Sequence, residues 1–367
     1  MDTTRTELEV KLERIRTLLE RSSLDALLLR QTSNFAWATC GADSYINRAD
    51  SLGVASLLIT PTNRFVVTNN IESARLIEEE GLTRQGWEFR VSNWYDQKDG
   101  ISELFSGMNL GVDSPFPGAV DLSWEIAKVR RQLTPEEGRR FEALGKLCAN
   151  GMSEAANSVR PGMTEFEIAG LLSHAVESRG VQVVVSLIAT DERIFSYRHP
   201  LPASKPLQKY AMLVVCGRKW GLICSLTRLV HFGALSDEIR RKAEAVARID
   251  AEMIAATRPG KTLDDVFRKA QEAYAATGFP DEWRDHHQGG SAGYMPREFT
   301  AMPMSDEPIL SGQVFAWNPS IKGVKSEDTI LVGEQINEIL TEMSGWPLME
   351  IQVGDQVIRR SAILEVK

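Results

Sequence analysis

A short motif that occurs twice in the C-terminal two-thirds of the chain limits its fold more than any other feature. Ser158-Val-Arg-Pro-Gly-Met-Thr164 returns 98 residues later as Ala256-Thr-Arg-Pro-Gly-Lys-Thr262. Each copy predicts that one helix ends before Arg-Pro-Gly and that a threonine caps the next, with Glu167 or Asp265 three residues on. Strands are predicted after both helix pairs, at 181–188, 211–216 and 222–231, and at 313–317, 329–332 and 356–364. We expect two related halves with sheets curved around a cleft and helices outside; the alternative is a turn that arose twice by chance.

A domain boundary is predicted near Leu133. In Leu133-Thr-Pro-Glu-Glu137, Thr134 can cap a helix, Pro135 suits its first position and Glu137 completes a capping box. The preceding residues predict an α/β domain, with a helix at 5–21, strands at 24–29, 51–60, 64–67 and 109–112, and a helix that Asn69 and Asn70 open. Because 367 residues exceed a typical single core, we expect domains at 1–132 and 133–367.

Charge and composition narrow the class of partner. The net charge of −8 and the lack of a Lys/Arg-rich run argue against nucleic acid. No apolar run approaches a membrane span, and the N-terminal residues form a charged amphipathic pattern, so we expect no membrane association. Four cysteines without Cys-x-x-Cys spacing indicate reduced thiols. The chain is therefore expected to be cytoplasmic, with a small molecule as its partner.

The whole chain resembles the creatinase, aminopeptidase P and prolidase superfamily of pita-bread proteins. The resemblance rests on Leu24-Asp-Ala-Leu-Leu-Leu29 and Ser33-Asn-Phe-Ala-Trp37 in the first domain, and on Arg160-Pro-Gly-Met-Thr-Glu-Phe-Glu167 in the second. It implies a creatinase-type α/β N-terminal domain and an α+β pita-bread C-terminal domain with a pseudo-twofold internal repeat. It also implies a homodimer.

The resemblance locates the positions where the family's peptidases hold two metal ions with Asp, Asp, His, Glu and Glu. Matching the motifs Ser225-Leu-Thr-Arg228, Gly289-Gly-Ser-Ala-Gly293, Asn318-Pro319 and Ser326-Glu-Asp-Thr329 places these residues at the five positions: Val214, Ser225, Gly290, Asn318 and Glu327. Hard divalent cations need several oxygen or imidazole donors, usually anionic ones, and only Glu327 is anionic. We therefore expect no metal ligands, no cofactor and no two-metal mechanism.

Two residues are candidates for catalysis. By resemblance to creatinase, His199 in Arg198-His-Pro-Leu-Pro202 would take a proton from water and pass it to a leaving nitrogen, a task that suits imidazole; the alternative is a surface histidine in a proline-rich turn. Glu327, without metal ions, would pair with a cationic substrate group. A salt bridge from Glu327 to Arg228 is the competing interpretation.

Other residues are predicted to contact the substrate. His286 and its neighbour His287 are expected to supply a cleft donor rather than ligands for one metal ion. Arg297, in Tyr294-Met-Pro-Arg-Glu298, resembles a creatinase arginine that holds the substrate carboxylate, a role suited to bidentate geometry; an exposed arginine is the alternative. The predicted contacts are completed by Asn318, Ser225 and Arg228, and by Arg48 from the loop 41–48, because creatinase's N-terminal domain contacts substrate across a dimer interface.

Three functions remain open from the sequence. The leading hypothesis is a metal-independent, creatinase-like hydrolase of a small nitrogen-containing metabolite, acting on an amidine, guanidine or amide C–N bond. A variant has Cys216 or Cys224 as a nucleophile near His199, against buried inert thiols. The alternatives are a catalytically inactive binding protein of peptidase fold and a metal-dependent Xaa-Pro peptidase whose ligands lie elsewhere.

Overall fold

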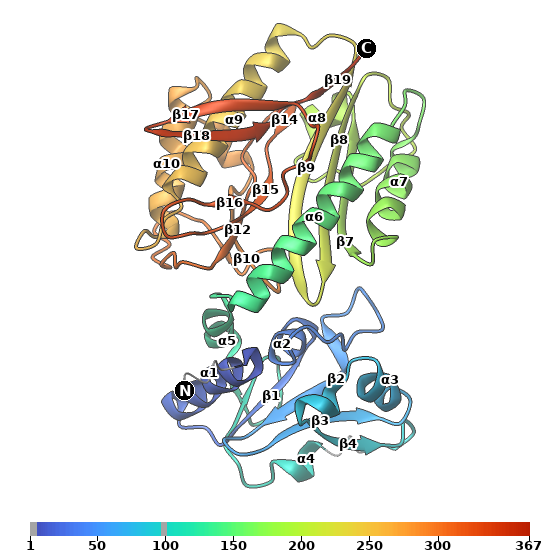
Figure 1. Ribbon diagram of the computed structural model, residues 1–367, viewed down its shortest axis with the longest axis vertical. Helices are drawn as coiled ribbons and strands as arrows, with labels where there is room; N and C mark the ends of the chain where they lie inside the picture. The colour runs from blue at the N-terminus through green and yellow to red at the C-terminus, as the bar shows by residue number, and fades with distance from the viewer. Residues whose placement is uncertain (1–5, 97–100) are drawn as a thin grey trace. The chain divides into compact units, whose positions relative to one another are not determined.

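The computed structural model describes residues 6–96 and 101–367, and the chain divides into two compact units between Glu136 and Glu137 (Figure 1). This division lies near the 132/133 boundary expected from the capping signals. Among the residues that the structure describes, no helix is long and apolar enough to cross a membrane.

The N-terminal unit is built on one six-stranded mixed sheet with the strand order β4-β3-β2-β1-β5-β6. Its strands are β1 (Ala26–Gln31), β2 (Leu52–Ile59), β3 (Arg64–Asn69), β4 (Glu88–Ser92), β5 (Leu110–Val112) and β6 (Val120–Asp121). Its helices are α1 (Glu7–Ser22), α2 (Thr32–Ala38), α3 (Ser73–Glu78), α4 (Ile101–Leu104) and α5 (Ser123–Arg130), with a 3₁₀ turn at Leu82–Gln85. Apolar residues on neighbouring strands pack into one core, for example Leu28, Leu58 and Val112.

The C-terminal unit holds two sheets and four long helices. The first sheet has the order β19-β9-β8-β7 and the second β11-β10-β12-β15-β16. The helices are α6 (Pro135–Ser158), α7 (Glu165–Glu177), α9 (Asp237–Ala256) and α10 (Leu263–Ala276), with short turns at α8 (Glu192–Ser196) and Glu282–Asp285. The long strands β7 (Gln182–Thr190), β8 (Tyr210–Lys219) and β9 (Leu222–Phe232) form a continuous antiparallel meander.

The shorter strands of this unit complete both sheets and form two separate hairpins, β13-β14 and β17-β18. They are β10 (Gly289–Ala292), β11 (Phe299–Thr300), β12 (Val314–Trp317), β13 (Ser320–Ile321), β14 (Val324–Lys325), β15 (Asp328–Leu331), β16 (Glu338–Ile339), β17 (Leu348–Val353), β18 (Gln356–Ser361) and β19 (Leu364–Val366). An isolated bridge between Thr227 of β9 and Glu327, just before β15, joins the two sheets. Glu327 is therefore held where the sheets meet.

The predicted internal repeat is confirmed in atomic detail. Thr164 and Thr262 each form a capping box with the acidic residue three positions on, and each also bridges a later proline, Pro206 or Pro308. The amides of the two motif glycines donate to equivalent carbonyls, Gly162 to Leu207 at 2.8 Å and Gly260 to Ile309 at 3.1 Å. Both glycines have φ near +90°, which other residues rarely adopt. A chance recurrence of one turn would not reproduce these longer-range contacts.

Candidate functional site

A cavity of about 280 Å³ opens in the C-terminal unit between its two sheets. One wall is apolar and comes from β7 and β8, with Val185, Leu187 and Val214. The opposite wall is polar and comes from the second half of the repeat. The remaining lining residues are His199, Cys216, His287, Pro296, Arg297, Asn318, Lys325 and Glu327. A small apolar cavity with convergent polar groups is the usual form of a small-molecule site.

Glu327 is the centre of the polar wall. Lys325 Nζ lies 2.8 Å from its Oε2 and Arg297 Nη2 lies 3.1 Å from its Oε1. The hydroxyl of Thr227 donates to Oε2 at 2.6 Å. With Glu327 only 3% exposed and Lys325 8% exposed, this is a buried carboxylate held between two cations. The negative charge of Glu327 is therefore already balanced by Lys325 and Arg297, and it does not need the cationic substrate group that was expected from the sequence.

The charge state of Glu327 follows from these contacts. Burial alone raises the pKa of a carboxyl group, but Lys325, then Arg297, outweigh burial and lower the pKa of Glu327 to about 2. The carboxylate is ionised at neutral pH. Together the three side chains carry one net positive charge, so the polar wall favours an anionic group in the cavity.

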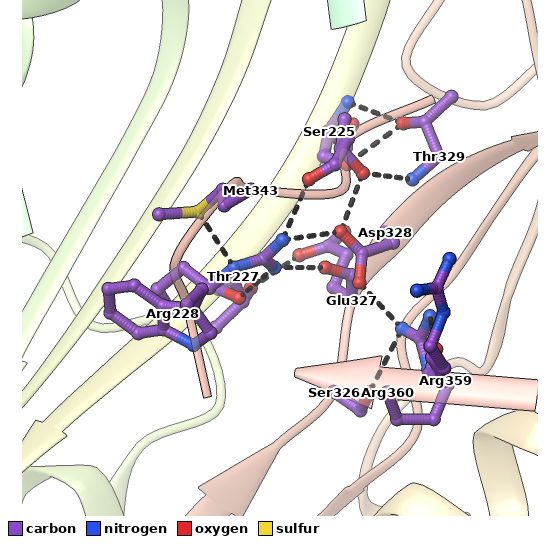
Figure 2. Close-up of polar contacts among 12 residues, drawn as sticks. Ser225, Thr227, Arg228, Ser326, Glu327, Asp328, Thr329, Met343, Arg359 and Arg360 are labelled. Carbon is purple, nitrogen blue, oxygen red and sulfur yellow. Dashed lines mark hydrogen bonds and ion pairs between the residues drawn. The ribbon is translucent and has the colours of Figure 1, made fainter. Parts of the chain in front are cut away.

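Arg228 belongs to a different, deeper network, so the predicted salt bridge to Glu327 and the predicted substrate contact are both corrected. Its Nη2 lies 2.7 Å from Asp328 Oδ1, and it also donates to the carbonyl oxygen of Thr341 at 2.8 Å. Asp328 Oδ2 in turn lies 2.8 Å from Arg360 Nη2 (Figure 2). Arg360 Nη2 also lies 2.6 Å from Asp250 Oδ2. These four charged side chains are all buried and balance one another. They join β9, β15, β18 and α9 beneath Glu327 and fix its backbone.

The five residues that the resemblance assigns to the family's metal positions do not offer the donors that two hard cations need. Val214 has no donor atom, and the hydroxyl of Ser225, which is fully buried and does not line the cavity, donates to Cys216 Sγ at 3.2 Å. Gly290 lies where β10 and β11 pair so closely that a Cβ would lie 2.0 Å from the carbonyl oxygen of Phe299. No side chain fits there without a shift of the backbone. Of the five positions only Asn318 and Glu327 bring oxygen to the cavity, and Glu327 is already paired, so two hard cations do not fit.

Asn318 contributes a second polar feature. It is 2% exposed and lines the cavity, and its Oδ1 has no hydrogen-bond partner among the described residues. It directly follows β12, and its backbone N–H donates to the carbonyl oxygen of Gln288 at 3.0 Å. Because an unpartnered buried oxygen is costly, a ligand N–H is its natural complement.

Three histidines gather at the edge of the cavity. His199 Nε2 lies 3.1 Å from His286 Nε2, and the ring centroid of His287 lies 5.6 Å from that of His199. His286 is buried behind His199, and its Nδ1 lies 3.3 Å from Ser320 Oγ. Burial, reinforced by Lys325, lowers the pKa of His199 and brings that of His286 to about 2. For His287, burial and then Arg297 lower the pKa to about 4, so all three rings are neutral at pH 7.

The remaining predicted site residues fall into two groups. Arg297 and His199 line the cavity, as the resemblance implied. Arg48 lies on an exposed turn of the N-terminal unit, whereas every residue that lines the cavity belongs to the C-terminal unit.

The two cysteines differ in their access to the cavity. Cys216 lines the cavity, but burial raises the pKa of its thiol to about 11. Cys224 is completely buried, and its Sγ lies 3.6 Å from the hydroxyl oxygen of Thr329. A thiol with so high a pKa is a poor nucleophile at neutral pH, because the thiolate is the reactive species. The covalent variant therefore has no support in the geometry.

Lys325 was missed by the sequence analysis. It lies two residues before Glu327 on an extended segment, so both side chains project to the same side. This spacing, Lys-x-Glu, is visible in the sequence and could have indicated the pair.

Comparison with known proteins agrees with the fold. Residues 139–334 match metallopeptidase family M24. The Xaa-Pro dipeptidase of Pyrococcus horikoshii is 21% identical over 356 residues, which cover 90% of this chain and 97% of the relative. The chain therefore belongs to metallopeptidase family M24.

Solved structures share the two-domain pita-bread architecture. The prolidase from Pyrococcus horikoshii OT3 superposes with a TM-score of 0.78 at 17% identity, covering 91% of this chain and 98% of that one. The N-terminal domain of the FACT complex subunit SPT16 from chickpea superposes with a TM-score of 0.68 at 13% identity, covering 92% of this chain and 97% of that one. At these identities the likeness establishes the fold, and function has to be argued from the site.

Proposed function

We propose that this chain is a metal-independent hydrolase that cleaves the C–N bond of a small nitrogen-containing metabolite. The observation that carries the proposal is the pairing of Glu327 with Lys325 and Arg297, at the position where the family's peptidases use metal ions. Lys325 and Arg297 supply positive charge at this position. His199 and the amide oxygen of Asn318 also line the cavity and can contact a substrate.

The charge of the site defines the substrate more closely than the sequence did. The earlier expectation of a cationic group opposite Glu327 is replaced, because that carboxylate is already matched by two cations. A carboxylate on the substrate would meet the excess positive charge of Arg297 and Lys325, and an N–H group would meet the free Oδ1 of Asn318. We therefore favour N-acyl, N-carbamoyl or N-amidino derivatives of small amino acids, which carry both groups and fit about 280 Å³.

The residues can carry hydrolysis as follows. His199 takes a proton from a water molecule, and the resulting hydroxide adds to the substrate carbon. The C–N bond then breaks, and His199 returns the proton to the leaving nitrogen, so no proton is gained or lost. The positive charge of Lys325 and Arg297 would also offset the negative charge that develops on the substrate. The apolar wall of β7 and β8 keeps bulk water away from the reacting carbon.

A substrate screen tests the proposal. The full chain, stripped of metal by a chelator, is incubated with a panel of N-acyl, N-carbamoyl and N-amidino amino acids and of Xaa-Pro dipeptides, and products are detected by mass spectrometry. We expect turnover of a carboxylate-bearing compound without metal, and its loss in His199→Ala. Turnover of Xaa-Pro dipeptides only after manganese is added would favour the metallopeptidase alternative, and binding without turnover would favour the inactive binding protein.

A further inference from the structure

We propose that His199, His286 and His287 form a binding site for a single late first-row transition-metal ion, separate from the family's metal positions. One donor nitrogen from each imidazole lies within 4.8 Å of the other two. These are three of the five histidines in the chain. Imidazole is the ligand that zinc, nickel and copper prefer, in contrast to the carboxylate-rich set of the peptidases.

The geometry of the closest pair already approaches that of bound ligands. The two Nε2 atoms of His199 and His286 are 3.1 Å apart. Two nitrogens that each lie 2.0–2.1 Å from a tetrahedral zinc ion are separated by roughly 3.3 Å. A metal ion can therefore replace the proton that these two rings share, with little movement of either. His287 needs a larger side-chain adjustment, and its exposed position leaves room for one.

The surroundings of the three rings also suit a ligand set. His286 is held from behind, since its Nδ1 lies 3.3 Å from Ser320 Oγ, and such outer contacts commonly orient metal-binding histidines. His199 and His287 are only partly buried and keep solvent-accessible surface, which provides an entry path from solvent. Lys325 and Arg297 oppose a cation here, but Glu327 offsets much of their charge.

An occupied site would remove His199 from catalysis. The metal site rests on geometry alone, whereas its inhibitory effect rests on the proposed function. When His199 donates its lone pair to a metal ion, that lone pair is no longer available to accept a proton from water. The structure thus links metal availability to hydrolysis by a shared residue: metal inhibits the enzyme instead of activating it.

Cobalt titration tests the site without any substrate. The metal-stripped full chain is titrated with Co²⁺, whose visible absorption reports nitrogen coordination, and Zn²⁺ is then added in competition. We expect one Co²⁺ per chain and displacement by Zn²⁺. Because loss of an outer-shell partner alone costs about 10–100-fold in metal affinity, loss of a ligand in His287→Ala should weaken binding by about 100-fold or more. His174→Gln, which changes an exposed histidine on α7, is the matched control and should bind like the unaltered chain.

Three results of the cobalt titration would contradict the proposed metal site. These are an absent cobalt band, a band that His287→Ala retains, or a band that His174→Gln abolishes. Melting curves of both variants establish that they are folded, and His199→Ala provides a second ligand variant. If Zn²⁺ binds but leaves turnover of an identified substrate unchanged, the inhibitory role is wrong although the site stands. Because binding is measured without substrate, failure of the site and failure of the proposed hydrolysis are distinguished.

Discussion

Replacement of Lys325 by methionine tests whether this side chain neutralises Glu327 within the fold. Lowering the pKa of Glu327 from 4.5 to about 2 corresponds to roughly 3 kcal/mol in favour of the ionised folded state. Lys325 is the larger of the two cationic contributions, and Arg297 remains in Lys325→Met. We therefore expect a loss of about 2 kcal/mol near pH 7, less than the 3–5 kcal/mol typical of a buried pair left without compensation.

The effect should depend on pH in a defined direction. Because the folded pKa of Glu327 is lowered, its stabilisation is present above the unfolded value of 4.5 and is lost as the pH falls toward about 2. The difference between the unaltered chain and Lys325→Met should therefore be smaller at about pH 3 than near pH 7.

Urea-dependent hydrogen exchange of the peptide that contains β15 measures this difference in the full chain. Arg240→Met serves as a control, because its ion pair with Glu365 is largely exposed and should contribute no more than about 1 kcal/mol. Adding Glu327→Gln completes a double-mutant cycle that isolates the coupling. A cost of Lys325→Met equal to that of the control, or unchanged at low pH, would refute the reasoning.

Three further predictions concern the buried network, the metal position and the thiols. Arg360→Met should destabilise the C-terminal unit by about 3–5 kcal/mol, because it leaves buried carboxylates short of a cation; calorimetry would detect this, and a cost below 1 kcal/mol would contradict it. Gly290→His should restore no manganese binding at the family's metal positions and should cost about 3 kcal/mol through overpacking; tight manganese binding by calorimetric titration would show this to be wrong. Iodoacetamide should alkylate partly exposed Cys40 well before Cys216, whose thiol has a pKa of about 11; peptide mass mapping checks the order.

Local sequence signals predicted much of the fold. The capping boxes at Thr164 and Thr262 depend on residues three positions apart, and the structure confirms both. The long strands β8 and β9 were also found, because β8 contains the apolar run Ala211–Cys216 and β9 is rich in apolar and β-branched residues. Short strands such as β10 and β11 were missed, since Gly289-Gly-Ser-Ala292 has little strand propensity and is held by its neighbours in the sheet.

Some of the residues that line the cavity were predictable from the sequence, but their pairings were not. Motif matching located Glu327, Arg297 and His199, which the structure brings to one cavity. It could not show that Arg297 already contacts Glu327, because 30 residues of chain separate them. For the same reason Arg228 was assigned to the substrate, although its guanidinium is satisfied by Asp328 in a network that only the packed sheets assemble. Partner choice among buried charges depends on tertiary structure.

The most direct test of the central claim is to measure turnover of the substrate panel by the metal-stripped protein, with chelator present and with manganese or cobalt added. We predict that a carboxylate-bearing C–N substrate is hydrolysed in the presence of chelator and that metal does not increase the rate. Activity that disappears on stripping and returns with manganese would contradict the account, because it would mean that metal ions, and not Lys325 and Arg297, provide the positive charge at Glu327.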